Sequence, residues 1–275
     1  TQGDIQVAGE YVVNAIRTMY ARAGRKVSLI GHSQGGMLPR WALRFWPDTR
    51  AMVDDDIGVA ASNHGSSGAQ FVCQLGCSPA DWQQSDSSQF IAALNSYQES
   101  FPGVSYTAIY TRFDEVVTPN SDDSGSSSIH GGGGDITNVA IQDVCPADFS
   151  DHLAVGTQDN TAYALAIDAL SHPGPAVPSN VPASVCTDPL MPGINKATYP
   201  ADALAAAAGF AQNVATAPQV QSEPPLKCYV TASCPAAPAL AVKAKKARCK
   251  KKRKRHRRAE ASKRRGCKKR HHKRR

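Results

Sequence analysis

The chain has 275 residues, a length that allows one core domain with appended segments. Its formal net charge of +8 conceals two opposite parts. Residues 1–242 carry 10 Lys and Arg against 22 Asp and Glu, whereas residues 243–275 carry 21 basic residues against one acid. We therefore expect an acidic domain followed by a basic tail. No run of 18 or more apolar residues occurs, which excludes an ordinary transmembrane helix.

The first predicted element is an amphipathic helix that stops at Gly24, a residue suited to a helix C-terminus. Its apolar face is formed at helical spacing by Ile5, Ala8, Val12, Ile16 and Met19. A short apolar run at 27–30 then predicts a strand, and residues 37–45 predict a second helix.

Between this strand and this helix lies the hexapeptide 31–36, Gly-His-Ser-Gln-Gly-Gly. A G-x-S-x-G sequence between a strand and a helix predicts a nucleophile elbow, in which Ser33 is held exposed in a strained turn. Gly31 and Gly35 would avoid crowding the serine backbone. The backbone N–H of Gln34 could then donate to a developing oxyanion. The alternative is a Gly/Ser loop that merely begins a helix.

Residues 63–90 follow, rich in Ser, Gln and Gly, with a tight Cys73–Cys77 loop. We expect this segment to lie above the site as a lid or pocket wall. The Ala-rich helix at 201–215 could form the opposite wall, or could be a packing helix. The Pro-rich stretches 172–200 and 216–242 are predicted connectors.

Residues 105–111 alternate and are rich in aromatic and β-branched side chains, which predicts a strand. Asp114 comes just after it, where ligand-facing loops of parallel sheets lie. We expect Asp114 to be the acid that orients a histidine, with Glu115 as its nearest rival.

A further strand is predicted at 136–141, and Asp151-His152 occupies the loop after it. The order Ser, acid, His makes His152 the expected general base. His64 precedes the acid, and His130 lies in a flexible Gly-rich segment. His32 adjoins the serine and is expected to line the pocket instead. Asp151 could cap the helix that follows.

Several segments together resemble the Candida antarctica lipase B-like family of α/β-hydrolase lipases, over roughly residues 10–240. The matching segments are the elbow and its helix (33–47), the acid segment (110–119), V-C-P (144–146), D-H-L (151–153), C-T-D-P-L-M-P (186–192) and the Ala-rich 200–217.

This resemblance implies an α/β-hydrolase fold, a mostly parallel sheet flanked by helices. It also implies triacylglycerol lipase or carboxylesterase activity, with Ser33, Asp114 and His152 as the catalytic triad and a disulfide between Cys145 and Cys186. His32 stands where the best-known member has tryptophan, so the resemblance does not extend to that member's alcohol selectivity.

In this fold the elbow follows the fifth strand, whereas here only one helix precedes it. We therefore expect the first strands to be lacking, together with the loop that supplies the second oxyanion donor. The nucleophile strand would then lie at a sheet edge. The chain would be a fragment of a longer precursor, or its first part was lost in gene calling or cloning.

Eight cysteines allow 105 pairings. Proximity in the sequence suggests three pairs besides the one implied by resemblance: Cys73/Cys77, Cys228/Cys234 and Cys249/Cys267. An even number of cysteines favours an oxidising compartment, and hence a secreted or cell-surface protein. No Cys/His spacing typical of a metal site occurs, so no metal and no cofactor are expected.

The tail, Lys243 to Arg275, is predicted to be disordered when free because of its self-repulsion. It could bind an anionic surface such as cell wall or anionic lipid, or it could simply keep the protein soluble. It has no interleaved aromatic residues, so sequence-specific nucleic-acid binding is not expected.

The predicted organisation is a lipase domain (1–217), a Pro-rich segment (218–242) and the basic tail (243–275). The predicted function is serine-dependent hydrolysis of acylglycerols or similar carboxylic esters. The alternative is a non-catalytic, truncated hydrolase-like carrier of a surface-binding tail.

Overall fold

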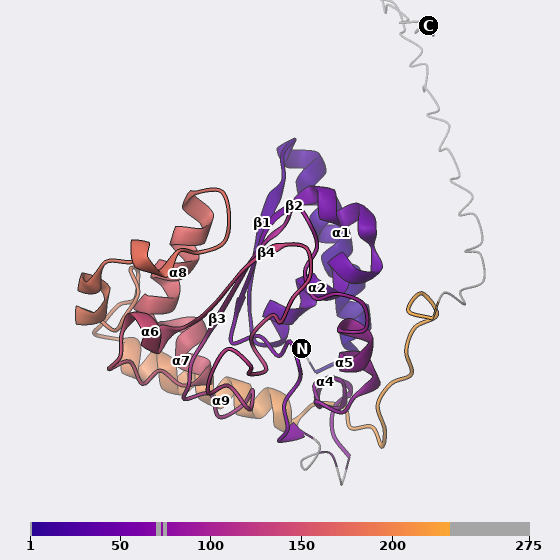
Figure 1. Ribbon diagram of the computed structural model, residues 1–275. Coiled ribbons are helices and arrows are strands. Elements are labelled where there is room, and N and C mark those ends of the chain that lie inside the picture. The colour runs from indigo at the N-terminus through magenta and orange to yellow at the C-terminus, as the bar shows by residue number, and fades with distance from the viewer. Residues whose placement is uncertain (1, 70–72, 74–75, 232–275) are drawn as a thin grey trace, which may run out of the picture. The chain divides into compact units, whose positions relative to one another are not determined.

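The computed structural model describes residues 2–69, 73 and 76–231 (Figure 1). They belong to a compact unit with the bounds Thr1–Pro235. The predicted basic tail, with Cys249 and Cys267, lies outside the described residues, as does Cys234. The division of the chain at residues 217 and 242 stays a prediction.

The centre of the unit is a four-stranded sheet in the order β1-β2-β3-β4. All three neighbouring pairs are parallel. The strands are β1 (Val27–His32), β2 (Val53–Val59), β3 (Ser105–Tyr110) and β4 (Asp135–Ala140). Within the described residues β1 is an edge strand, the position expected for the strand before the elbow.

Strand β2 is the one strand of this sheet that sequence reasoning missed. Its sequence, VDDDIGV, places three acids in a row where a buried parallel strand is normally apolar. Two of the acids are nevertheless buried, Asp55 and Asp56. Ser28 Oγ donates to a carboxylate oxygen of Asp55 at 2.5 Å, whereas neither oxygen of Asp56 has a hydrogen-bond partner.

Helices cover both faces of the sheet (Figure 1). Helices α1 (Ile5–Ala23) and α2 (Gln34–Phe45) cover one face, and α8 (Asn160–Ser171) contacts β2 and β3 on the other. Side chains of β3 alternate between the two faces of the sheet and so belong to two separate hydrophobic cores. Tyr106 packs with α1 and α2, and Ile109 packs with α8.

Helix α1 ends as predicted, with Gly24 in the left-handed region at φ 66°. Its buried face differs from the predicted one. Gly9 and Val13 are buried, whereas Met19 is exposed. The reason is close packing on α2: a Cβ at position 9 would lie 2.5 Å from Cδ1 of Trp41, so only glycine lets the helices approach this closely.

The remaining elements are short, apart from α9. They are η1 (Pro47–Met52), α4 (Pro79–Gln83), α5 (Gln89–Leu94), α6 (Ile141–Val144), α7 (His152–Thr157), η3 (Pro178–Asn180), η4 (Ala183–Thr187) and α9 (Tyr199–Ala215). We predicted that the helix at 201–215 either packs in the core or forms a pocket wall. No residue of α9 is buried, so it is not a packing helix. Among the described residues no helix has the length and apolarity needed to cross a membrane.

Two of the predicted disulfides are present, Cys73–Cys77 and Cys145–Cys186. Cys228 is also disulfide-bonded, although its predicted partner Cys234 is not described. Residues 218–231 form an ordered strap over the α4–α5 region. In this strap the carboxylate of Glu223 accepts hydrogen bonds from two N–H groups at the start of α5, at 2.9 and 2.8 Å.

Asp56 makes the stability of this core dependent on pH. Its side chain is 3% exposed, and burial raises its pKa from 3.8 to about 7, although the positive charge of Arg40 opposes the shift. Between these two values the folded state keeps a proton that the unfolded state has released. Folding stability therefore falls as the pH rises from about 4 to about 7, and this contribution is constant above 7.

We expect Asp56→Asn to raise the free energy of unfolding at pH 8, by up to about 4 kcal/mol, and to change it little at pH 4. Asp54→Asn is the matched control, because Asp54 is an exposed neighbour on the same strand. Urea denaturation of the three proteins from pH 4 to 8 measures both effects. An Asp56→Asn variant whose stability follows the same pH curve as the wild type would contradict the prediction.

Candidate functional site

Three strands deliver the candidate residues to one edge of the sheet. Ser33 directly follows β1, Asp114 lies in the loop after β3, and His152 begins the second helix after β4. The strands are parallel, so their carboxyl ends lie together, and residues 119 positions apart in the chain become neighbours.

The imidazole of His152 lies between the two other candidates. Its Nε2 is 2.9 Å from Ser33 Oγ and its Nδ1 is 3.0 Å from a carboxylate oxygen of Asp114. His152 is 2% exposed and Asp114 is 8% exposed. A carboxylate only accepts, so Nδ1 carries the proton and Nε2 is free to accept from the serine hydroxyl.

The elbow geometry appears in the backbone of Ser33, which has φ 57° and ψ −130°. This strained conformation is rare for any residue with a side chain. A Cβ at position 31 would lie 2.2 Å from the backbone oxygen of Gly35, so Gly31 is required. The expectation for Gly35 was wrong: a Cβ there meets open space, and it is Gly36 that is crowded, at 2.9 Å from Ala61 Cβ.

Gln34 is the first residue of α2 and lies directly after the serine. Helix geometry leaves the first N–H groups without acceptors inside the helix. The helix dipole adds partial positive charge at the same end. The N–H of Gln34 is therefore available to a negatively charged oxygen beside Ser33.

Asp114 is held in place by its own loop. Its Oδ1 accepts from the N–H groups of Val116 and Val117 at 3.0 and 2.7 Å, and Nδ2 of Asn120 lies 3.4 Å from Oδ2. The rival Glu115 faces elsewhere, because its Oε2 accepts from the backbone N–H of His152 at 3.1 Å. Asp114, and not Glu115, thus contacts the imidazole.

His152 is fixed through its backbone as well as its ring. It is the first residue of α7 rather than a loop residue, and Asp151 caps that helix by accepting from the N–H of Ala154 at 2.8 Å. The capping role that was the alternative for Asp151 is thus the one observed. A cap fixes the direction of α7 and therefore the point from which the imidazole extends.

His32 makes a contact that sequence reasoning missed. Its Nε2 is 2.8 Å from the backbone oxygen of His152, and the two rings are 4.8 Å apart. Burial, followed by the charge of His152, lowers the pKa of His32. The neutral ring with its proton on Nε2 can therefore donate to this oxygen. The two remaining candidates, His64 and His130, stack on each other beside Glu99.

A cavity of about 350 Å³ adjoins the loop of Asp114. Both predicted walls contribute to it, because lining residues come from the 63–90 segment and from helix α9. It is lined by Ser62, Ser66, Gly68, Ala69, Asp81, Gln84, Glu115, Val116, Val117, Phe210 and Val214. Glu115 connects this cavity to the backbone of His152.

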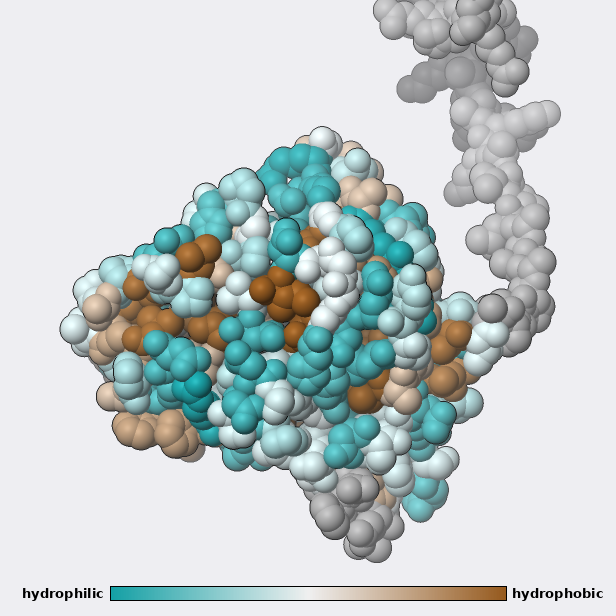
Figure 2. Space-filling model, viewed as in Figure 1, coloured by the Kyte–Doolittle hydropathy of each residue, from teal (hydrophilic) through white to brown (hydrophobic). Residues whose placement is uncertain are grey.

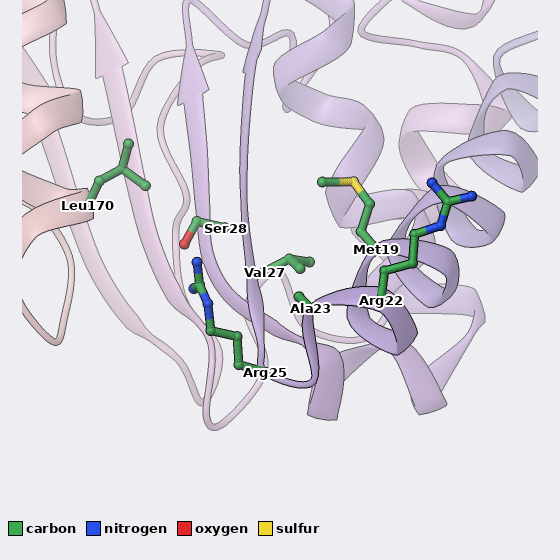
Figure 3. A pocket seen from close by; sticks show the side chains of 7 residues that line it. All are labelled: Met19, Arg22, Ala23, Arg25, Val27, Ser28 and Leu170. Carbon is green, nitrogen blue, oxygen red and sulfur yellow. The ribbon is translucent and has the colours of Figure 1, made fainter.

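A larger cavity of about 580 Å³ lies at the other end of β1 (Figure 3). Side chains from the end of α1, the start of β1 and the end of α8 surround it, among them Arg22, Arg25 and Leu170. The length of β1 separates it from Ser33 by roughly 20 Å. It therefore takes no part in the site.

The surface carries separate apolar patches between hydrophilic areas (Figure 2). Exposed apolar side chains occur on the segments that surround the candidate residues. Phe113 follows β3 and packs against exposed Phe149 at 5.2 Å, and Val116 is also exposed. On α9, Leu204, Phe210 and Val214 are exposed.

Comparison with known proteins gives a consistent result. The family profile described as lipase (class 2) matches residues 12–142. Lipase B of Pseudozyma antarctica is 35% identical over 144 residues, which are 52% of this chain and 42% of that protein. The crystal structure of Aspergillus fumigatus lipase B superposes with a TM-score of 0.74 at 31% identity, over 84% of this chain and 57% of that one.

The fold is therefore that of an α/β-hydrolase, as predicted. The chain spans about half the length of the relatives it matches.

The contact between His32 and α7 depends on the absence of a side chain at Gly156. Measurements of the free energy of unfolding can test this dependence. A Cβ at position 156 would lie 2.1 Å from Cδ2 of His32. We expect Gly156→Ala to destabilise the wild type by about 1–3 kcal/mol through overpacking. In a His32→Ala background the same change should be neutral or stabilising by up to about 1 kcal/mol, because alanine favours helices.

Urea denaturation of the four proteins measures this double-mutant cycle. An equal loss of stability in both backgrounds would show that the ring of His32 does not occupy this place.

Proposed function

Because this chain belongs to the lipase B-like family of α/β-hydrolases, we propose that it contributes the catalytic machinery for hydrolysing carboxylic esters, with acylglycerols as the substrate class. The observation that carries the proposal is the simultaneous contact of His152 with Ser33 and Asp114. A buried imidazole placed between a hydroxyl and a carboxylate is the arrangement that activates a serine nucleophile.

In the proposed reaction Ser33 Oγ attacks the ester carbonyl carbon while its proton passes to Nε2 of His152. Asp114 stabilises the resulting imidazolium through Nδ1. The carbonyl oxygen becomes an oxyanion and accepts from the N–H of Gln34. Collapse of this intermediate expels the alcohol, which takes the proton from Nε2, and leaves an acyl-serine.

Water completes the cycle. Its proton passes to Nε2 of His152 as its oxygen attacks the acyl carbon, and the second collapse returns the proton to Ser33 Oγ as the carboxylic acid leaves. His152 therefore moves one proton in each half-reaction. Its position must stay constant throughout, which is the proposed role of the contacts from His32 and Glu115 to its backbone.

We assign the acyl chain to the cavity of about 350 Å³ beside the Asp114 loop. Val116 and Val117 line it next to the proposed acid, and Phe210 and Val214 close it from α9. The exposed apolar side chains of this region, Phe113 and Phe149 among them, suit contact with a lipid aggregate.

The disulfides support an oxidising compartment, and we propose a secreted or cell-surface location. Binding of an anionic surface by Lys243 to Arg275 stays a prediction, because those residues lie outside the described part of the chain. The non-catalytic carrier, which rested on that tail, gains no support from the described residues.

We expect Ser33→Ala to abolish hydrolysis of p-nitrophenyl butyrate and labelling by a fluorophosphonate probe. Ser171→Ala is the control, since Ser171 is an exposed serine at the end of α8. Turnover is measured by absorbance, and the labelled peptide is identified by mass spectrometry. Labelling of any other serine, or turnover retained in Ser33→Ala, would refute the assignment.

Asp114→Asn and Glu115→Gln distinguish the two neighbouring acids. The first should lower kcat by roughly 10²–10⁴-fold, because an amide cannot hold the imidazole in the same tautomer with the same charge. The second should change kcat less than about threefold, because a glutamine oxygen can still accept from the N–H of His152. A reversed order of the two losses would transfer the acid role to Glu115.

If the acyl chain binds in this cavity, filling the cavity should lower kcat/KM more for esters with long acyl chains than for esters with short ones. Val214→Trp should fill the cavity and lower kcat/KM for a p-nitrophenyl octanoate at least about tenfold, while acetate hydrolysis changes little. Leu204→Trp on the same helix is the control, because Leu204 is 73% exposed and does not line the cavity. Equal losses on both esters would place the acyl chain elsewhere.

A further inference from the structure

Two histidines and a glutamate that serve no role in the proposed reaction lie together. His64 lies between β2 and α4, Glu99 between α5 and β3, and His130 between β3 and β4, so three different loops supply them. One ligand atom from each, a ring nitrogen or a carboxylate oxygen, lies within 4.8 Å of the other two. Their separation by 35 and 31 residues explains why no metal-site spacing occurs in the sequence.

The hydrogen bonds of His64 carry the argument. Its Nδ1 is 3.2 Å from the backbone oxygen of Ser126, and its Nε2 is 3.0 Å from Oε1 of Glu99. Both partners are acceptors. A neutral imidazole has one N–H and can satisfy only one of them. When the Nδ1 proton is donated to the carbonyl oxygen, the lone pair of Nε2 faces a carboxylate oxygen of Glu99. These two atoms then form one side of a candidate metal site.

The surroundings match those of a metal ligand. A metal-bound histidine commonly donates its other N–H to a backbone carbonyl, as Nδ1 does here. Glu99 is fixed through Oε2, which accepts from the backbone N–H of His130 at 2.9 Å and lies 3.6 Å from Arg40 Nη2. Its Oε1 is left to face His64. Arg40 is buried, so the carboxylate has little freedom to turn away.

His130 supplies the third ligand. Its ring stacks on that of His64, with centroids 4.2 Å apart and planes at 12°. Parallel rings do not aim both lone pairs at one point, so the ring of His130 has to rotate about its side-chain bonds. The side chain is exposed and free to do so. Tetrahedral bonds of about 2.0–2.2 Å require ligand atoms about 3.3 Å apart, so the rotation has to bring the His130 nitrogen closer to the other two ligand atoms.

We propose that His64, Glu99 and His130 bind a first-row divalent metal ion of the Zn²⁺ type, with water as the fourth ligand. Two imidazoles and one carboxylate are the donor set that such ions prefer. Binding needs no co-reactant, because the ring nitrogens and the carboxylate oxygen supply the electron pairs that the ion accepts.

The site would stabilise the region that holds Asp114. The backbone N–H of His64 donates to the backbone oxygen of Ser126, and Nδ2 of Asn63 donates to the backbone oxygen of Ser127. Asn120 in turn donates to Ser127 Oγ at 2.8 Å and lies beside Asp114. A metal ion that joins the 64 and 130 loops would therefore stiffen the segment behind the acid.

The test is titration of the full chain with ZnCl₂, measured by calorimetry and by the melting temperature. We expect saturable binding, and a rise in Tm of roughly 5–10 °C at a hundredfold excess over Kd. His130→Gln should weaken this binding at least tenfold and remove about half of the rise or more. This variant keeps the backbone N–H that fixes Glu99, so it preserves the fold.

His172→Gln is the matched control. His172 also pairs with an acid, since its Nε2 lies 2.9 Å from a carboxylate oxygen of Asp168, but it is far from the three proposed ligands along the chain. It should leave zinc binding unchanged. The chain offers other zinc ligands, namely the His32–His152 pair and the histidines and cysteines of residues 249–272. Equal zinc affinity in the wild type and His130→Gln would assign the binding to those groups and overturn the proposal.

Cobalt(II) gives an independent readout. Tetrahedral nitrogen and oxygen ligation should produce a visible d–d band that His130→Gln loses. A thiolate charge-transfer band in the near ultraviolet would instead reveal cysteine ligation and contradict the assignment. Absence of saturable binding by either ion would overturn the proposal.

Discussion

The close approach of two backbone segments at Gly31 is the constraint on which the site depends. The end of β1 and the first turn of α2 come so near each other that a methyl group at position 31 would overlap the oxygen of Gly35. The chain can make this turn only by placing Ser33 in a strained conformation. The same turn points the start of α2 at the space beside the serine, so the proposed nucleophile and the N–H group proposed to bind the oxyanion are positioned together.

The partners of the serine reach it independently of this turn. Parallel pairing sets where β3 and β4 end, and each loop is then fixed by its own short-range hydrogen bonds. Asp114 is held by the N–H groups that follow it, and His152 by a helix cap. All four polar groups of His152 have partners: its two ring nitrogens, its N–H through Glu115 and its C=O through His32. Such a residue has little freedom to drift from its neighbours.

The elbow and three of the four strands could be predicted from the sequence because each has a recognisable local residue pattern. Strands 27–30, 105–111 and 136–141 show apolar or alternating patterns, and their order predicts that Asp114 and His152 lie beside Ser33, as they do in the structure. Strand β2 was missed since its three consecutive acids contradict the pattern of a buried strand, and only tertiary packing compensates for them.

Other features could not be read from the sequence because they are contacts across the fold. The requirement at Gly36 rather than Gly35 depends on Ala61, and the role of His32 depends on α7. His64 and His130 looked like rejected bases when considered one at a time. Only the convergence of three connections shows that they share Glu99.

The Cys145–Cys186 bond has a topological consequence for the histidine. It closes a covalent ring that contains α7 and α8, so His152 lies inside a ring of the chain rather than on an open segment. A single proteolytic cut in the largely exposed 177–184 stretch would open this ring without releasing either part. The helix that carries the imidazole would remain joined to the sheet through its N-terminal side, and only a cut combined with reduction would release the part of the chain after the cut.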